Sequence, residues 1–268
     1  MSIPKIIHYC WFGGNPLSEK EEYCIASWKK YCPDYEIKRW DETNFNVMKS
    51  PFTRNAYEKK KWAFISDYAR LEIIYSQGGI YLDTDVELIK PLDDLLQLRG
   101  FIGRECENYT INPGLGFGAE KELPIIGEFL SIYERGDFGC KNEKYEIIPI
   151  PLVLTEYMSK NKEGFVVADT YQIFDDLHIF PVKFFCPQNC YTGETRITDA
   201  TYSIHHFLSS WKSDDEKRRF ALYRKCVNIF GENVGSLVSN AIQTLLDNGI
   251  KITFKKTISY IGKRTGKQ

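Results

Sequence analysis

The chain has 268 residues, of which 43% are hydrophobic and 26% are charged, so a sizeable core can form and global disorder is excluded. The formal net charge is −1, which excludes a general electrostatic attraction to nucleic acid. No apolar run reaches the ~20 residues that a membrane-spanning helix needs. The length suits one sizeable domain, alone or with an appended helical part.

The first forty residues read as a β-α-β unit. Residues 3–12 are apolar, aromatic and β-branched and end at a glycine pair, which predicts a buried strand followed by a loop of the kind that binds ligands in α/β proteins. Ser18 followed by Glu21 is a capping-box pattern, which predicts the start of a helix. Residues 35–40 alternate as a strand does. This order is typical of a parallel sheet.

Residues 59–77 form the next predicted helix, with apolar residues at helical spacing and Gly78 as its C-cap. Asp67 and Arg70 are three positions apart, so they share one edge of this helix. A surface ion pair at this spacing would contribute little stability. Because the other faces of the helix are apolar, however, this edge is also a candidate lining of a binding site.

A short strand that ends in two carboxylates follows. Residues 80–82 are apolar and lead into Asp83 and Asp85, which are separated by one residue. In a strand these side chains point the same way, and in a tight turn they converge. Two carboxylates this close repel each other unless a cation lies between them, and a hard divalent ion is the expected cation.

The middle of the chain continues the α/β pattern. Residues 112–119 are rich in glycine but lack the spacing of a phosphate-binding loop or a dinucleotide fingerprint. They predict either irregular backbone close to a ligand or turns between strands. The remaining predicted elements are short strands at 101–103, 166–167, 173 and 179–181, and helices at 93–96, 123–133 and within 148–158.

Two features close the chain. Residues 201–211 predict the last strand and the loop after it, and residues 214–246 predict a helical part. Residues 249–268 contain six basic residues and no acidic residue, interleaved with apolar ones. Such a tail either rests on an anionic membrane surface or is a solvated terminus.

His205 and His206 provide further candidate metal ligands at the end of the last strand. An ion held by Asp83, Asp85 and one imidazole has mixed oxygen and nitrogen ligands, which suits Mn²⁺, or Mg²⁺ with waters. So few protein ligands leave open positions, which phosphate oxygens typically fill. The residues therefore predict a metal that neutralises a diphosphate, whose developing charge must be stabilised as it departs.

Four blocks stand in a distinctive order: residues 3–8 with Trp11, residues 61–70, residues 78–85, and His205-His206 followed by Ser210-Trp211. Together they resemble the Asp-x-Asp sugar-binding glycosyltransferases of family 32, which include bacterial capsular and surface polysaccharide transferases and yeast mannosyltransferases. The resemblance implies a GT-A fold with a mostly parallel central sheet flanked by helices. It also implies transfer from a nucleotide-diphospho-sugar donor, with retention at the anomeric carbon.

The resemblance also implies roles for residues that match the family's motifs. Tyr9 and Trp11, on the first strand, would line the nucleotide base, and Asp67 and Arg70 would contact the donor's sugar and diphosphate. Asp83 would bind donor hydroxyls, or the metal through water.

The remaining implied roles concern the metal and the closure of the site. Asp85 would ligate the metal directly, and His205 is the better match to the family's late histidine. Ser210 and Trp211 would close over the diphosphate. Residues 207–209 depart from the family's pattern, so the choice between His205 and His206 stays open.

We therefore expect a metal-dependent retaining glycosyltransferase that acts in bacterial surface polysaccharide synthesis, with a saccharide or lipid-linked saccharide as acceptor. Residues 1–213 would form the catalytic domain, and residues 214–268 a helical extension whose basic tail is a candidate contact to the inner membrane. Eight cysteines without a signal-peptide pattern predict a reducing cytoplasm. The single Cys186-x3-Cys190 pair is weak evidence for zinc.

Two alternatives remain open from the sequence. A haloacid-dehalogenase-like phosphatase also has a buried strand ending in Asp-x-Asp, with the first aspartate, here Asp83, as nucleophile. Glu87 stands where that class has Thr or Val. The second alternative is a carbohydrate- or metal-binding module without catalysis.

Overall fold

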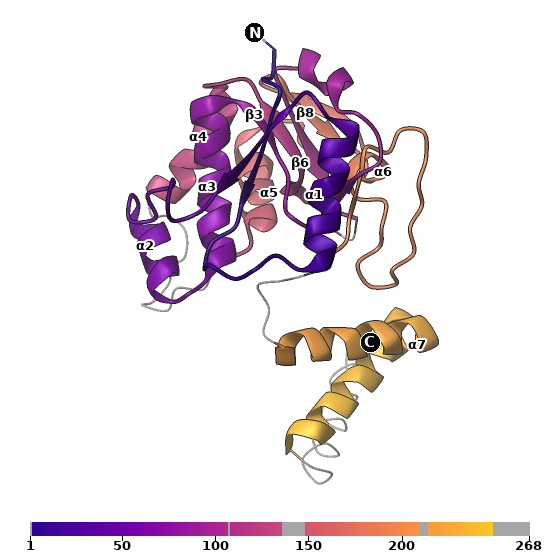
Figure 1. Cartoon of the computed structure of the whole chain (residues 1–268). Helices are drawn as coiled ribbons and strands as arrows, with labels where there is room; N and C mark the ends of the chain where they lie inside the picture. The colour runs from indigo at the N-terminus through magenta and orange to yellow at the C-terminus, as the bar shows by residue number, and fades with distance from the viewer. Residues whose placement is uncertain (1, 107, 136–147, 209–213, 249–268) are drawn as a thin grey trace. The chain divides into compact units, whose positions relative to one another are not determined.

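The computed structural model describes residues 2–106, 108–135, 148–208 and 214–248. The chain divides into two compact units, residues 1–190 with 194–208 and residues 191–193 with 209–268. The first unit contains a central sheet flanked by helices, which confirms the predicted α/β class (Figure 1). The functional division into a catalytic domain and a helical extension stays a prediction.

A seven-stranded sheet forms the centre of the first unit, in the order β2-β1-β3-β6-β5-β8-β7, and β4 pairs with β9 in a separate two-stranded sheet. The strands are β1 (Ile6–Cys10), β2 (Glu36–Trp40), β3 (Gly79–Tyr81), β4 (Val86–Leu88), β5 (Gly100–Arg104), β6 (Ile111–Ala119), β7 (Gln172–Phe174), β8 (Leu177–Phe180) and β9 (Ser203–His205).

The prediction that this sheet is mostly parallel is wrong. β1 pairs in parallel with β2 and β3, and β5 with β8, whereas β3–β6, β5–β6 and β7–β8 are antiparallel. For β5–β6 and β7–β8 the reason is the short connection, because a parallel pair needs a crossover of a dozen or more residues. Asp175 and Asp176, with φ of 47° and 63°, turn β7 directly into β8.

Helices cover both faces of the sheet. α1 begins at the predicted capping box, in which Ser18 and Glu21 cap each other's backbone N–H groups. α3 begins three residues later than predicted, after Lys60 with φ of 53° reverses the chain. The helices of this unit are α1 (Glu19–Tyr31), α2 (Pro51–Glu58), α3 (Trp62–Gln77), the 3₁₀ helix η1 (Asp93–Gln97), α4 (Pro124–Glu134), α5 (Ile150–Asn161) and α6 (Val182–Phe185).

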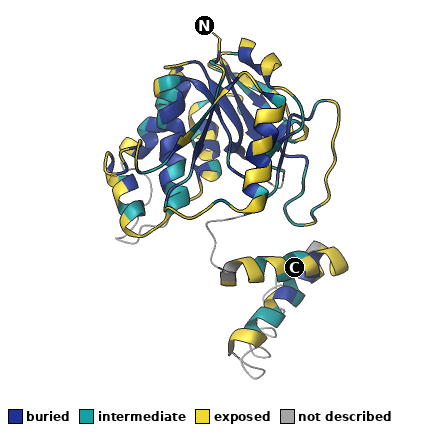
Figure 2. Ribbon diagram, in the orientation of Figure 1, coloured by how far each residue is buried: buried dark blue, intermediate teal, exposed yellow. Residues whose placement is uncertain are grey.

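The core consists of two apolar clusters, which alternate along the strands as a two-residue period requires. In β1, Ile7 and Tyr9 belong to the cluster that contains Trp28 of α1, whereas Cys10 belongs to the cluster that contains Ile65 of α3. The inner strands β1, β3, β5 and β6 are therefore buried along nearly their whole length, whereas the edge strands β2 and β7 are partly exposed (Figure 2). Because the inner strands are packed on both faces, the backbone at their ends is held in place, and so are the polar residues that follow them.

Two other predicted segments differ in the structure. Val166 and Val167 form a loop rather than a strand, and their side chains are about half exposed. The Gly-rich residues 112–119 lie within β6, which is buried throughout. Glycine content lowers strand propensity, so packing between neighbouring strands overrides the local preference here.

The second unit is described for its helical part. α7 (Asp214–Asn248) is interrupted at Gly231, whose φ of 73° and ψ of 168° are not helical. Arg219 in the first half forms a two-point ion pair with Asp247 in the second half, at 2.9 Å for each contact. The predicted helical C-terminal part is confirmed as far as Asn248, and the basic tail lies outside the described residues. No helix in the described ranges is long and apolar enough to cross a membrane.

Candidate functional site

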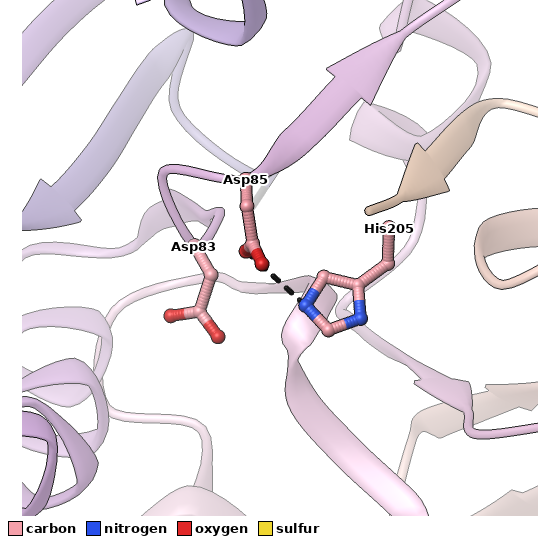
Figure 3. A group of neighbouring side chains, drawn as sticks. All are labelled: Asp83, Asp85 and His205. Atoms are coloured by element: carbon pink, nitrogen blue, oxygen red, sulfur yellow. Dashed lines mark ion pairs between the residues drawn. The ribbon is translucent and has the colours of Figure 1, made fainter. Parts of the chain in front are cut away.

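The structure brings Asp83, Asp85 and His205 together. One potential ligand atom from each residue lies within 4.8 Å of the others (Figure 3). Asp83 and Asp85 follow β3, and the antiparallel pairing of β4 with β9 places His205 opposite Val86. His205 thus meets two aspartates about 120 positions before it in the sequence, because two short strands pair in this register.

Asp85 is held on both carboxylate oxygens. Its Oδ1 lies 3.1 Å from Nε2 of His205, and its Oδ2 accepts a hydrogen bond of 2.8 Å from the backbone N–H of Leu208. Burial by itself would raise the pKa of Asp85, but His205 and this N–H lower it below its ordinary value. Asp85 is therefore ionised at neutral pH and available to a cation.

The imidazole of His205 is buried. Burial alone would lower its pKa, but the field of Asp85 raises the pKa above its ordinary value. Its Nδ1 has no hydrogen-bond partner within the described part of the chain. A histidine held against two carboxylates, at a mixed oxygen and nitrogen site, fits Mn²⁺ or Mg²⁺.

The two neighbouring histidines have different partners. His206 turns away from this cluster, and its Nε2 lies 2.8 Å from Oε2 of Glu87. The hydroxyl of Tyr23 donates to the other oxygen of Glu87 at 2.8 Å. Of the two histidines that the sequence left open, the structure therefore places His205 beside Asp85 and His206 in a separate polar contact.

Asp83 is bound by an arginine rather than by a histidine. Nη2 of Arg70 lies 3.2 Å from Oδ1 of Asp83 and 3.1 Å from Oδ1 of Asp67, and the Tyr81 hydroxyl donates to Asp83 at 3.1 Å. Arg70 is buried, and these carboxylates raise its pKa against the effect of burial. The edge of α3 that carries Asp67 and Arg70 therefore lines the site, and the pair is not a surface ion pair.

Asp67 is the most perturbed acid of the site. Burial raises its pKa to about 7, although Arg70 acts in the opposite direction. Its protonation therefore changes near neutral pH, whereas Asp85 stays ionised.

Gly114 is a site residue that the sequence pattern did not single out. Ile102 and Gly103 are adjacent in β5, but their partners in β6 are Phe117 and Asn112. Residues 113–116 of β6 therefore form a bulge. The backbone N–H of Asp83 donates to the Gly114 carbonyl at 2.9 Å. A Cβ atom at Gly114 would lie 2.0 Å from Oδ2 of Asp83, so only glycine leaves room for this carboxylate. The glycine content of the segment was the available signal.

Of the predicted base-binding residues, Tyr9 lies on β1, the strand next to β3, and Trp11 directly follows the end of β1. β1 pairs with β3, and the backbone N–H of Leu82 donates to His8. Tyr9 is buried and packs edge-on against Trp28, and Trp11 donates its indole N–H to the Asn15 carbonyl. Their role in binding the base stays a prediction. Ser210 and Trp211 lie outside the described residues.

Comparisons with known proteins confirm the resemblance. Residues 18–101 match a family model described as a glycosyltransferase sugar-binding region containing a DXD motif. The chain is 32% identical over 120 residues to an inositol phosphoceramide mannosyltransferase of Schizosaccharomyces pombe, covering 43% of this chain and 33% of that protein. It is 25% identical to human alpha-1,4-N-acetylglucosaminyltransferase, covering 62% of this chain and 47% of that protein.

Two further matches extend the comparison. An uncharacterized glycosyltransferase of Acanthamoeba polyphaga mimivirus is 28% identical over 246 residues, covering 86% of this chain and 89% of that protein. The solved PaToxG glycosyltransferase is 24% identical with a TM-score of 0.47, covering 61% of this chain and 71% of that one. The chain spans less than half the length of the yeast mannosyltransferase and of the human N-acetylglucosaminyltransferase.

Proposed function

Residues 18–101 carry the sugar-binding region of the DXD glycosyltransferases, and from this premise we propose that the chain transfers a sugar from a nucleotide-diphospho-sugar to a saccharide or lipid-linked saccharide. The observation that carries the proposal is the convergence of Asp83, Asp85 and His205 beside Arg70. One side of the site can hold a divalent cation, and the other holds a buried guanidinium. Both are suited to the negative charge of a diphosphate.

In this proposal Asp85 and His205 ligate Mn²⁺ or Mg²⁺, and Asp83 contributes through water or through donor hydroxyls. The ion would neutralise the charge that develops on the departing diphosphate. Arg70 contacts the diphosphate and the sugar, and its position is fixed by Asp67 and Asp83. Because these partners hold it before substrate arrives, little reorganisation is needed when charge develops.

The family implies further properties that we include in the proposal: a GT-A fold for residues 1–213 and retention at the anomeric carbon. Ser210 and Trp211 would close over the diphosphate, and Tyr9 and Trp11 would line the base. We also propose a role in bacterial surface polysaccharide synthesis in the cytoplasm, as the resemblance to family 32 implies. A relative named for mannosyl transfer to inositol phosphoceramide supports a lipid-linked acceptor.

A thermal-shift screen of nucleotide-diphospho-sugars tests the donor, with Mn²⁺ present and with EDTA. A true donor raises the melting temperature in proportion to the logarithm of its concentration over its dissociation constant, and only with metal. A melting temperature that no donor changes would count against the proposal. Release of phosphate from an aryl phosphate, blocked by Asp83→Asn, would favour the phosphatase alternative instead.

We propose in addition that residues 249–268 bring the enzyme to an anionic membrane, because the segment has six basic residues and no acid. Vesicle sedimentation of the full chain and of a truncation after Asn248 tests this, with neutral phosphatidylcholine vesicles as the control. The full chain should bind vesicles that contain phosphatidylserine, and the truncation should not. Equal binding of both proteins would disprove the role of the tail.

A further inference from the structure

Two cysteine thiols form a close pair outside the metal-ligand cluster. Cys106 follows β5, and Cys186 lies at the C-terminal cap of α6. Both Sγ atoms donate to the carbonyl oxygen of Gln188, at 3.2 Å and 4.0 Å. Cys186 is fully buried, and Cys106 is partly exposed and packs against the same apolar cluster.

The backbone segments that carry the two cysteines lie close together, and both thiols point at the same carbonyl oxygen. A Cβ atom placed on Gly103 would lie 3.0 Å from the Cβ of Phe185, so β5 and α6 approach each other closely. Cys106 and Cys186 follow these two positions along the chain. The neighbouring Cys106 thiol, followed by burial, raises the pKa of Cys186 well above its ordinary value.

A chain of hydrogen bonds connects this pair to the candidate metal site. Glu105, next to Cys106, accepts a hydrogen bond of 3.4 Å from the Asn112 amide. The amide oxygen of Asn112 accepts from the Gly114 N–H at 2.8 Å, and the Gly114 carbonyl accepts from the Asp83 N–H at 2.9 Å. Three successive hydrogen bonds thus join the residue next to Cys106 to the backbone of Asp83.

We propose that Cys106 and Cys186 form a site of reversible oxidation, at which a hydroperoxide closes a disulfide between them. The Cys106 thiol attacks the peroxide oxygen, which gives a sulfenic acid and releases the other oxygen as water. The Cys186 sulfur then attacks the sulfenic sulfur, and the hydroxyl departs with the Cys186 proton as a second water. Two thiols thus lose two electrons and two protons, and one hydrogen peroxide becomes two waters.

Exposure decides the order of these steps. Solvent reaches Cys106, so peroxide attacks that sulfur first. The Cys106 thiol and burial raise the pKa of Cys186, and burial also keeps peroxide away from it, so Cys186 serves as the resolving thiol. A dithiol reductant reverses the reaction by thiol–disulfide exchange. This linkage chemistry does not depend on the proposed function.

Peptide mapping after mild treatment with hydrogen peroxide tests the linkage. Cys186 and Cys190 fall within one tryptic peptide, residues 184–196, so the folded Cys190→Ser protein is used to assign the bond. We expect this peptide to be joined to residues 105–121, lighter than the sum of the two by two hydrogen atoms. Dithiothreitol should separate them, and the link should be absent in Cys190→Ser/Cys186→Ser.

Two results would overturn the assignment. One is a treated Cys190→Ser protein in which both thiols still react fully with iodoacetamide, or in which Cys106 passes to the sulfinic acid without forming the link. The other is a link that survives Cys186→Ser. Cys24 and Cys32, which are buried on and after α1, provide an internal control that should stay unmodified.

A second measurement tests the connection to Asp83, and this part rests on the proposed metal site. We expect the disulfide form to bind Mn²⁺ about tenfold more weakly than the reduced form, a loss typical of a disturbed outer shell. Cys106→Ser should not respond to peroxide. Equal affinity in both forms would disprove the connection, whereas no Mn²⁺ binding in either form would disprove the metal site itself.

Discussion

The two carboxylates of the Asp-x-Asp motif lie on different sides of the site and have different partners. Asp83 meets Arg70, which is 13 positions away on the helix directly before it. Asp85 meets His205 and the Leu208 backbone, more than 100 positions downstream. One carboxylate thus already has a permanent cation, whereas the other has a ligand set suited to a metal.

This difference assigns separate tasks to adjacent acids of the same type. An arginine is permanently charged, so Asp83 is neutralised in every state of the protein. A histidine can release its proton when a metal binds, so the negative charge of Asp85 becomes available to the ion. The following predictions test the two sides against each other.

The largest effect should come from the metal side. Asp85→Ala should reduce sugar-nucleotide turnover by at least about 10²-fold, because it removes a direct ligand of the ion that stabilises the leaving group. Initial rates with saturating donor and Mn²⁺ measure this. Glu87→Gln, on the same strand but paired with His206, is the matched control. Near-normal turnover of the Asp85 variant would refute its role as a ligand.

The two histidines should respond unequally. His205→Gln should weaken Mn²⁺ binding about tenfold to a hundredfold, the range typical of a disturbed metal site. His206→Gln should leave the Mn²⁺ affinity unchanged, because that imidazole contacts Glu87 instead. Isothermal titration of Mn²⁺ into each variant gives both constants. The opposite ranking would show that the ligand set is assigned to the wrong histidine.

The arginine side should be sensitive to added volume. Gly114→Ala would place a methyl group 2.0 Å from Oδ2 of Asp83, so Asp83 must leave Arg70. We expect the KM for donor to rise about tenfold, with a cost in stability of about 1–3 kcal/mol for the overpacking. The KM for donor of Gly114→Ala, Asp83→Asn and the double variant shows whether the effect of Gly114→Ala comes from the displacement of Asp83. Fully additive effects would show that Gly114 does not act through Asp83.

A smaller effect concerns stability and pH. Because burial raises the pKa of Asp67 in the folded protein to about 7, the folded state holds this proton more tightly than the unfolded state. Stability from this group is therefore fully present below the ordinary pKa of about 3.9 and is lost as pH rises toward 7, by at most ~1.4 kcal/mol per unit.

Urea unfolding at pH 5 and pH 7, at fixed ionic strength and with EDTA, measures that loss. Asp67→Asn cannot ionise, so it should lose less stability than the parent protein between these two pH values. Asp41→Asn is a control, because Asp41 is a partly buried acid outside the site whose pKa is lowered by Thr43 and by Arg39. The same pH dependence in the parent protein and in Asp67→Asn would show that Asp67 is ionised in both states.

The sequence by itself determined the features that depend on neighbouring residues. The Ser18 capping box, the buried first strand, the shared helix edge of Asp67 and Arg70, and the strand leading into Asp83 all follow from local hydrogen bonding and periodicity. Each of these signals is complete within one or two turns of helix or one strand. They were sufficient to predict the α/β class and a cation near the two aspartates.

Only the tertiary structure decided the features that depend on strand pairing. The β4–β9 register determines that His205 rather than His206 faces Asp85, because a shift by one residue turns every side chain to the other face. The bulge in β6 determines that Gly114 lies against Asp83. The antiparallel neighbours β6 and β7 likewise made the sheet mixed. Such contacts join distant segments, so no local pattern encodes them.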